Sequence, residues 1–575
     1  MALLYKLHTR DDLAFELGIP LKKLTHILYG KHTEKCYFSF SVPKRSGGQR
    51  LICAPIEDLK SVQKRLARLF QDKRIEMSKT CECPRVLSHG FERKKDIFTN
   101  AKIHRNKRFV LNLDLEDFFG SVHFGRIVGY LEKNKSFLLS HEVAVAIAQL
   151  CCYQGKLPQG APTSPVLANM VCDVLDYRLL KIAKKYRVDY TRYADDLSFS
   201  TNDPKFLENY DAFYHEVAGT IKRAGFMVNE KKTRLQYRDS RQTVTGLVVN
   251  KIINIDRRYY KDTRAMADRL YKTGAFKIDG ADGTIAQLEG RFAFMHRCDR
   301  LNSDHLEEKK SSAYLTSRER QYQKFLFYKT FYAHDIPLLV MEGPTDIRYI
   351  KAALMNMHER YPKLVQKNPD SSFKFKIRFF RRTERWKYLF DINEGADSMR
   401  NIYEFYVGDK GRPAYFEQFK KIRISEQMRP VILVFDNELQ NNNKPLCKFV
   451  NGARKSKDIR KSISDSCHAH LLDDGYLHLV THPLVGDVKE GEIESLFDDA
   501  TRKLVLGGKT LTLSGSFDTS KHYGKDIFSQ HIISNYESID FSGFCPMLDQ
   551  INAIIMDCES ASNNSTPDSS TVATS

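Results

Sequence analysis

The sequence lacks long apolar runs, contains a single tryptophan among 575 residues, and shows no cysteine framework. A membrane helix requires about eighteen or more apolar residues, and the nearest candidate, residues 142–153, is too short. The first residues run directly into charged ones without the apolar core of a signal peptide. The twelve cysteines have neither zinc-site nor disulfide-framework spacing. We therefore predict a cytoplasmic protein with no membrane partner.

Positive charge is concentrated in the first part of the chain. Residues 1–330 contain 59 Lys and Arg against 38 Asp and Glu, a net charge of +21, whereas the remainder contains 32 and 33, a net charge of −1. A chain of this length forms roughly two to four domains. A basic first part indicates nucleic-acid binding, although a solvated basic surface would have the same composition.

Two adjacent aspartates lie between β-prone stretches. The residues around Tyr-Ala-Asp-Asp at 193–196 predict a β-hairpin with Asp195 and Asp196 at its tip. Neighbouring like charges repel, so a fold that holds them together usually supplies a cation. Carboxylate oxygens suit Mg²⁺, which keeps positions open for substrate phosphates. A bare Asp-Asp pair is more often a solvated turn, so the metal-site interpretation depends on further residues upstream.

A third carboxylate belongs to Asp114, which follows an apolar strand predicted from residue 108. Three carboxylates can hold two Mg²⁺ ions, an arrangement that matches in-line phosphoryl transfer. One ion would activate a 3′-hydroxyl and the other would steady the leaving pyrophosphate. Taken alone, Asp114 is equally well explained as a helix N-cap.

Three further segments offer contacts for a nucleotide. Residues 38–55 predict a hairpin whose basic Gly-Gly turn presents Lys44, Arg45 and Arg50 to a triphosphate or template backbone. Gly160 would let the backbone approach a base pair closely. Lys232 could protonate pyrophosphate, although a lysine pair is more often a solvated face.

These motifs together resemble motifs A, B and C of reverse transcriptases. The resemblance rests on Asp114 with Phe119, on Leu-Pro-Gln-Gly at 157–160 and on Tyr-Ala-Asp-Asp at 193–196, in that order and spacing. It implies that the three aspartates bind metal. It also implies that Gln159 and Phe119 border the incoming dNTP, with Phe119 excluding a ribose 2′-hydroxyl.

The resemblance covers about residues 1–325 and implies an α+β right-hand polymerase. Fingers and palm would occupy 1–250, the thumb 251–325, and a connector 326–335. Two signatures narrow the family to bacterial retron reverse transcriptases: Asn-Ala-x-x-His at 100–104 and Val-Thr-Gly at 244–246. The residues that this family would place against RNA are Asn100, His104, Val244, Thr245, Gly246, Arg238 and Arg241.

Membership of that family implies a substrate and a product. The enzyme would copy part of its own structured noncoding RNA, start from an internal guanosine 2′-hydroxyl, and leave a branched RNA–DNA hybrid. A group II intron reverse transcriptase is the alternative, and we rank it lower because no basic DNA-binding zinc module follows the thumb.

Two buried strands, each followed by carboxylates, predict a second domain. Residues 336–341 lead into Glu342, and residues 430–435 lead into Asp436 and Glu438. Buried strands alternating with helices indicate an α/β domain with a parallel sheet, whose ligand sites lie at the carboxyl ends of the strands. Two ordinary strand-to-helix turns are the plainer alternative.

This second part, residues 336–556, resembles a Toprim domain of the overcoming-lysogenization-defect nuclease branch. Glu342-Gly343, Asp346 and the Asp-x-Asp-like Asp436-Asn437-Glu438 carry the resemblance, and Glu494 is a weaker candidate. It implies that Glu342, Asp436 and Glu438 bind Mg²⁺ or Mn²⁺, with Glu342 catalytic. Residues 557–575 are rich in Ser, Thr and Asn and predict a disordered tail.

The whole sequence therefore predicts a bifunctional enzyme, a retron reverse transcriptase with a fused nuclease that acts in antiphage defence. Its nuclease substrate would be cellular or phage nucleic acid, including RNA such as tRNA, and we expect a homo-oligomer. The rival hypothesis is a scaffold whose second domain binds nucleic acid without catalysis, and the Glu at position 438 leaves that hypothesis open.

Overall fold

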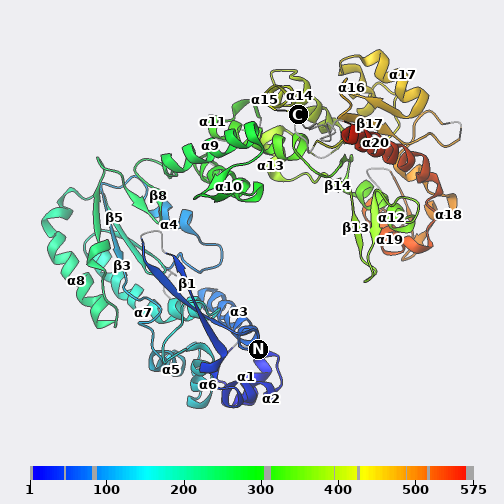
Figure 1. The fold of residues 1–575 in the computed structure, drawn as a ribbon. Coiled ribbons are helices and arrows are strands. Elements are labelled where there is room, and N and C mark those ends of the chain that lie inside the picture. Colours follow the sequence, from blue (N-terminus) through cyan, green and yellow to red (C-terminus); the bar gives the residue numbers. More distant parts are fainter. Residues whose placement is uncertain are drawn as a thin grey trace, which may run out of the picture. The chain divides into compact units, whose positions relative to one another are not determined.

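The computed structural model describes residues 4–43, 47–79, 87–303, 312–393, 395–423, 428–486, 488–513 and 518–564 (Figure 1). Lys44 and Arg45 of the predicted basic turn lie outside these ranges. The chain divides into two compact units. Unit 1 comprises Met1–Tyr259 with Cys298–Asn302, and unit 2 comprises Tyr260–Arg297 with Ser303–Ser575.

Unit 1 is built on a four-stranded antiparallel sheet with the strand order β4-β5-β3-β6. Strands β3 and β5 are buried along almost their whole length. The predicted hairpin around 193–196 is confirmed: β4 pairs with β5, and Tyr193 lies opposite Asp196. The bounds of the sheet strands are β3 Phe109–Asp114, β4 Asp189–Tyr193, β5 Asp196–Thr201 and β6 Arg234–Tyr237.

One face of this sheet packs on helices through aromatic rings. Tyr190 and Phe199 face each other across β4 and β5 and stack with ring centroids 4.8 Å apart. Phe213 of α8 meets Phe199 edge-on at 5.3 Å. On the same face Asp176 of α7 accepts hydrogen bonds from Tyr190 and Arg192. The face therefore combines an apolar core with one buried ion pair.

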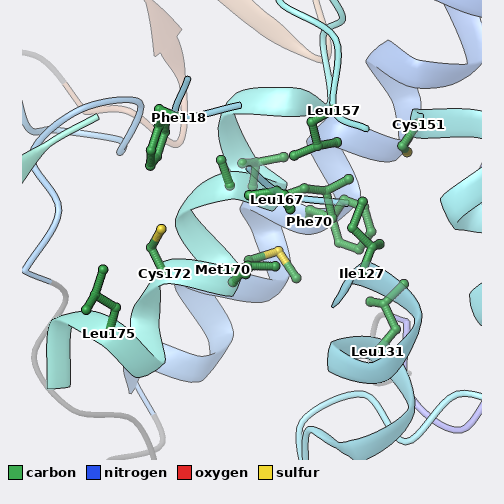
Figure 2. Close-up of a cluster of buried hydrophobic side chains, with 14 of the residues drawn as sticks. Phe70, Phe118, Ile127, Leu131, Cys151, Leu157, Leu167, Met170, Cys172 and Leu175 are labelled. Carbon is green, nitrogen blue, oxygen red and sulfur yellow. The ribbon is translucent and has the colours of Figure 1, made fainter. Parts of the chain in front are cut away.

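Helix α7 is the centre of the apolar core of unit 1 (Figure 2). Its residues Leu167, Met170 and Leu175 are almost fully buried, and Phe70 of α3 and Ile127 of α5 belong to the same core. The helices of unit 1 are α1 Arg10–Leu17, α2 Leu21–Thr25, α3 Glu57–Lys79, α4 Ile97–Ile103, α5 Phe124–Lys133, α6 His141–Cys151, α7 Ser164–Lys185 and α8 Tyr210–Arg223.

The predicted basic hairpin is also present. Strands β1 (Tyr37–Pro43) and β2 (Gln49–Pro55) pair antiparallel, with Val42 opposite Arg50. A second, very short hairpin joins β7 (Thr243–Val244) to β8 (Leu247–Val248). Its turn residues Thr245 and Gly246 both have positive φ angles, the geometry of a tight two-residue turn.

Unit 2 contains a five-stranded sheet with the order β14-β11-β15-β17-β16. The first four strands are parallel and β16 joins the edge antiparallel, so the predicted parallel sheet is confirmed. The strands of unit 2 are β9 Lys277–Ile278, β10 Ala281–Asp282, β11 Leu338–Val340, β12 Val365–Lys367, β13 Phe373–Phe375, β14 Arg378–Phe379, β15 Val431–Phe435, β16 His468–His470, β17 Leu477–Thr481, β18 Val505–Leu506, β19 Lys509–Leu511 and β20 His522–Tyr523.

Helices flank this sheet in the βα order expected of an α/β domain. Along the chain, helix α12 follows β11 directly, and α16 and α17 come after β15 and before β16. The remaining helices are α9 Arg257–Thr273, α10 Ile285–Ser303, α11 Ser317–Phe327, α12 Pro344–Asn356, α13 Glu384–Phe390, α14 Met399–Val407, α15 Tyr415–Ile422, α16 Pro445–Gly452, α17 Ser456–Ser466, α18 Asp499–Arg502, α19 Lys525–Ser534 and α20 Cys545–Asn564.

The prediction of a connector at 326–335 is wrong. These residues complete α11 and a short π-helix, Tyr328–Tyr332, whose aromatic side chains are buried. Tyr328 packs against Tyr271 of α9 and Phe419 of α15, with ring centroids 4.9 and 5.0 Å apart. The predicted thumb helices therefore share one aromatic core with the second domain, because most of α9 and α10 belongs to unit 2.

The predicted disordered tail begins too early. Helix α20 continues to Asn564, so residues 557–564 are helical, and residues 565–575 lie outside the described part of the chain. The apolar residues Ile551, Ile554 and Ile555 anchor this helix in the core of unit 2. Among the described residues, no helix combines the length and apolarity needed to cross a membrane.

The buried ion pair between Arg192 and Asp176 gives a prediction for stability. Both side chains are almost fully buried, and Nη2 of Arg192 lies 2.7 Å from Oδ2 of Asp176. Asp176→Asn leaves a buried guanidinium without its countercharge, which costs about 3–5 kcal/mol. We expect that loss in urea unfolding of the whole chain followed by circular dichroism.

The matched control is Asp189→Asn, which removes a half-exposed carboxylate paired with Lys107. Surface ion pairs contribute about 0–1 kcal/mol, so this variant should stay close to the wild type. Equal losses of stability in the two variants would contradict the assignment of Arg192–Asp176 as the pair that supports the sheet.

Candidate functional site

The structure brings together the three aspartates predicted to bind metal. Asp114 ends β3 and lies opposite Asp196 at the start of β5. The backbone N–H of Leu115 donates to the carbonyl of Asp195 at 3.0 Å, which ties the strand end to the hairpin turn. Three carboxylates therefore lie at one edge of the sheet of unit 1.

Neighbouring residues hold the turn that carries Asp195 and Asp196. Ala194 has a φ of +56°, a left-handed conformation that costs energy for a residue with a Cβ. Nη1 of Arg192 donates to the Ala194 carbonyl at 3.1 Å, so the buried ion pair also fixes the turn. Gly90 lies so close that a Cβ there would be 2.6 Å from the Ala194 nitrogen. Only glycine fits at this position.

Cations act on the carboxylates from two directions. Nζ of Lys232 lies 2.9 Å from both carboxylate oxygens of Asp114, and this hydrogen bond raises the pKa of Lys232. Desolvation, together with the charge of Asp114, raises the pKa of Asp195, whereas the charge of Arg50 on β2 lowers it. Desolvation and the charges of Asp195 and Asp114 raise the pKa of Asp196.

The donor set fits divalent metal ions. All its candidate ligands are carboxylate oxygens, which hard cations such as Mg²⁺ prefer. The raised pKa values of Asp195 and Asp196 arise in part from the other carboxylates, so a divalent cation between them would favour their charged forms. Asp196 is exposed, so the carboxylates are open to a substrate from solvent.

The predicted nucleotide-binding residues lie in partly exposed positions near this site. Phe119 packs edge-on against Phe118 and is only half-buried. The carbonyl of Gln159 accepts from the Cys53 N–H of β2 at 2.8 Å. At Gly160, a Cβ would lie 2.8 Å from the Cys53 carbonyl, so the close neighbour in this structure is β2. Their contacts with a nucleotide remain predictions.

The prediction that Asn100 and His104 contact RNA is wrong, because both side chains are fully buried. His104 bonds to the hydroxyl groups of Ser200 and Thr191, each at 2.7 Å, and Thr191 donates to Asn100 at 2.6 Å. Burial lowers the pKa of His104 to about 3, so the ring is neutral. This motif fastens α4 to strands β4 and β5.

The Val-Thr-Gly motif forms the β7–β8 turn. Val244 is buried, which excludes it from direct RNA contact, whereas Gly246 is exposed. Arg238 and Arg241 are also exposed, although Arg241 forms a 2.8 Å ion pair with Asp256. Roles in RNA binding for Thr245, Gly246, Arg238 and Arg241 remain predictions.

A second carboxylate site lies at the carboxyl end of the parallel sheet in unit 2. Glu342 follows β11 and Asp436 follows β15, and these two strands are neighbours. Oε1 of Glu342 accepts from the Asp436 N–H at 2.9 Å, and Oδ1 of Asp436 accepts from the Ile493 N–H at 2.9 Å. The structure therefore brings these two predicted ligands together.

Asp346 belongs to this site as well. Its carboxylate accepts from the Gly343 N–H at 2.8 Å at the start of α12, and the charge of Asp436 acts on it. Burial, followed by the charge of Asp436, raises the pKa of Asp346 to about 6 and that of Glu342 to about 8. Oxygen ligands with pKa values raised by one another fit Mg²⁺ or Mn²⁺, which would release these protons.

Glu438 and Glu494 are each paired with a lysine. Nζ of Lys444 lies 2.5 Å from Oε1 of Glu438. Nζ of Lys525 lies 3.1 Å from Oε2 of Glu494, which is fully buried. The charge of Glu438 still raises the pKa of Glu342, so Glu438 lies at the rim of the same site.

Sequence reasoning missed two residues of this site. His482 follows β17 and lies with Nε2 3.7 Å from Oδ1 of Asp436. The same signal that pointed to Glu342 and Asp436, a polar residue directly after a buried strand, would have found it. Lys525 begins α19 far along the chain, and no local pattern links it to Glu494.

Comparisons with known proteins agree with the architecture of unit 1. A family model described as reverse transcriptase (RNA-dependent DNA polymerase) matches residues 42–254. This range contains the sheet, the three aspartates and Lys232. Unit 1 is thus a reverse transcriptase domain.

Two relatives narrow the class. The retron Mx65 reverse transcriptase of Myxococcus xanthus is 36% identical over 307 residues, which are 50% of this chain and 67% of that protein. The retron Ec86 reverse transcriptase of Escherichia coli is 32% identical over 291 residues, 50% of this chain and 83% of that protein. The chain belongs to the retron reverse transcriptases.

Solved structures add little to this identification. The telomerases of Candida tropicalis and Candida albicans align with TM-scores of 0.30 and 0.31 at 13% and 12% identity. The alignments cover 38% and 50% of this chain and 55% and 56% of the telomerase chains. A likeness at this level carries no argument about function.

The buried His104 predicts a specific dependence of stability on pH. Its pKa is about 3 in the folded chain and about 6.5 when unfolded, so the unfolded state binds the extra proton first. The stability that His104 contributes is complete above pH 6.5 and decreases as the pH falls toward 3. Between pH 6.5 and pH 5 the loss is about 2 kcal/mol.

His104→Gln removes the titrating group, so its stability deficit relative to the wild type should shrink by about that amount between pH 7.5 and pH 5. Urea unfolding at both pH values measures this difference. His215→Gln, at an exposed position on α8, is the control and should show no change. A deficit that is the same at both pH values would show that His104 is not held neutral in the folded protein.

Proposed function

We propose that this chain is an RNA-directed DNA polymerase that copies part of its own structured noncoding RNA into RNA-linked single-stranded DNA. The observation that carries the proposal is the meeting of Asp114, Asp195 and Asp196 at one sheet edge, in a chain that belongs to the retron reverse transcriptases. Its substrates would be the four dNTPs and its partner the cognate noncoding RNA.

The residues around the site divide the work of the reaction. Mg²⁺ held by the three carboxylates would supply the Lewis-acid chemistry of phosphoryl transfer. Lys232 keeps its ammonium beside Asp114, where it can give a proton to the leaving pyrophosphate. Arg50 brings a further positive charge from β2 toward Asp195 and suits the triphosphate. Phe119 would border the sugar of the incoming dNTP.

Replacing Asp195 and Asp196 together with Asn tests the proposal. The double variant loses two of the three anionic ligands. The metal contribution to the transition state amounts to several kcal/mol, which corresponds to about a thousandfold in rate. Extension of a DNA primer on an RNA template with dNTPs and Mg²⁺ measures this loss.

Asp203→Asn serves as the matched control, since Asp203 caps a short 3₁₀ helix beyond the end of β5. It should extend the primer at the wild-type rate. Undiminished synthesis by the Asp195→Asn, Asp196→Asn variant, with circular dichroism unchanged, would refute the polymerase assignment of these residues.

We further propose that unit 2 contains a Toprim-like, metal-dependent nuclease. The carboxylates of Glu342 and Asp436 at the ends of adjacent parallel strands, with Asp346 in the first turn of α12, support this proposal. Mg²⁺ or Mn²⁺ held there would activate a water for attack on a phosphodiester. Glu342, buried and bonded to the backbone of Asp436, would take the proton of that water. The carboxylate of Glu438, at the rim of the site, would complete the set of metal ligands once its ion pair with Lys444 is broken.

The nuclease would act on cellular or phage nucleic acid in antiphage defence, restrained by the RNA–DNA product bound to the polymerase. The low net charge of the second part supports such a dependence, because residues 331–575 offer little surplus of basic side chains. A non-catalytic scaffold is the rival that the following experiment distinguishes.

Glu342→Gln and Asp436→Asn should each reduce cleavage of labelled RNA and DNA in Mn²⁺ or Mg²⁺. Loss of a residue that only orients a metal ligand costs about 10–100-fold, and loss of a ligand should cost at least as much. Asp409→Asn, on the loop after α14, is the control and should cleave normally. Both variants should still extend primers.

Cleavage that persists in the two variants at the wild-type level would assign it to a contaminant or another site. Absence of cleavage in the wild type under every metal, with and without the bound RNA–DNA product, would favour the scaffold. Neither result would affect the polymerase assignment, because neither substitution changes Asp114, Asp195 or Asp196.

A further inference from the structure

Three histidines converge on the edge of the sheet in unit 2. His468 and His470 are two residues apart on β16, so their side chains emerge on the same face. His478 on β17 lies directly opposite His470. The ring centroids are 4.8–5.3 Å apart, and one ligand nitrogen from each ring lies within 4.8 Å of the others.

The hydrogen bonds of His478 fix its tautomer. Its Nε2 lies 2.7 Å from the carbonyl of Gly475, which can only accept, so Nε2 carries the proton. Nδ1 therefore presents a lone pair toward the cluster. Histidines that bind metals generally donate their second N–H to a carbonyl or carboxylate in this way, which sets the orientation of the ring.

The spacing of two nitrogens already approaches that of metal ligands. Nε2 of His468 lies 3.0 Å from Nδ1 of His478. Two nitrogens at the usual zinc–nitrogen distance in a tetrahedral site are about 3.3–3.4 Å apart. Replacing the shared proton with a metal ion would thus require the rings to separate by only a few tenths of an ångström.

The state of the rings and the surroundings also suit a metal. His478 is buried and His468 is half-buried, so little water competes with an ion for their ring nitrogens. His470 is exposed and leaves the cluster open to an arriving ion. The carboxylate of Asp557 on α20 lies near enough for its charge to act on His468.

We propose that His468, His470 and His478 bind a zinc ion. The ion would fasten the edge strand β16 to β17. His478 is the second residue of β17, whereas His482 near Asp436 follows its last residue. The two lie about 13 Å apart along the strand, so the histidine cluster is separate from the carboxylate site.

Zinc binding by the full chain tests the proposal. The protein is produced without a histidine tag, stripped with a chelator, and dialysed against Zn²⁺ in millimolar Mg²⁺. Elemental analysis should find one more Zn²⁺ per chain in the wild type than in His470→Gln. His215→Gln, with an exposed histidine on α8, should match the wild type.

Two further measurements separate a specific site from loose binding. Co²⁺ in place of Zn²⁺ should give the visible absorption of a tetrahedral centre in the wild type and not in His470→Gln. Zn²⁺ should also raise the thermal midpoint reported by Trp386, the single tryptophan, which lies in unit 2. A circular dichroism spectrum of His470→Gln that matches the wild type verifies that the variant is folded.

Equal zinc content in the wild type, His470→Gln and His468→Gln would overturn the proposal. So would a zinc content in the wild type below about one tenth of an equivalent per chain after reconstitution. Loss of one Zn²⁺ in His470→Gln together with an unchanged content in His215→Gln would support it.

Discussion

Carboxylates crowded at the ends of neighbouring strands impose the main constraint on this molecule. In unit 1 the register that places Asp114 opposite Asp196 forces like charges together. The turn that carries Asp195 and Asp196 holds Ala194 in a strained, left-handed conformation. Arg192, which is paired with the buried Asp176, stabilises that turn by donating a hydrogen bond to the Ala194 carbonyl. The sheet, helix α7 and the site therefore depend on one interaction, because the same guanidinium contacts all three.

The two units meet the same electrostatic problem in different ways. In unit 1 the half-exposed ammonium of Lys232 neutralises Asp114. In unit 2 the backbone supplies the donors, since Glu342, Asp346 and Asp436 each accept a backbone N–H. Bound protons neutralise the remaining negative charge, as the raised pKa values of Glu342 and Asp346 indicate. A divalent cation would neutralise the carboxylates in place of the lysine and the protons, so both sets of residues fit a divalent cation.

Sequence reasoning located the strand ends correctly because a buried strand followed by a carboxylate is a local pattern. It found Asp114, Asp195, Glu342 and Asp436 at such ends. It misjudged Asn100 and His104, since a motif shows that residues matter without showing whether they face solvent or core. Burial behind β4 and β5 depends on tertiary packing, which no local pattern records.

The misplaced connector follows from the same limitation and changes how the chain must be studied. The charged, helix-prone sequence before residue 336 indicates a connector, yet α11 buries Tyr322 against Phe292 of α10 with parallel rings 5.5 Å apart. Glu289 of α10 pairs with Lys329 and with Arg385 of α13. The predicted thumb helices are thus part of the core of unit 2.

A fragment that begins at residue 336 would remove α9, α10 and α11 from that core. Trp386 would then lose Phe331, and Phe419 would lose Tyr271 and Tyr328, and the exposed rings would favour aggregation over folding. An excised second domain that shows no activity would therefore say little about the carboxylates at the ends of its strands. Single substitutions in the whole chain avoid this difficulty, because they leave the shared aromatic core in place while changing one ligand.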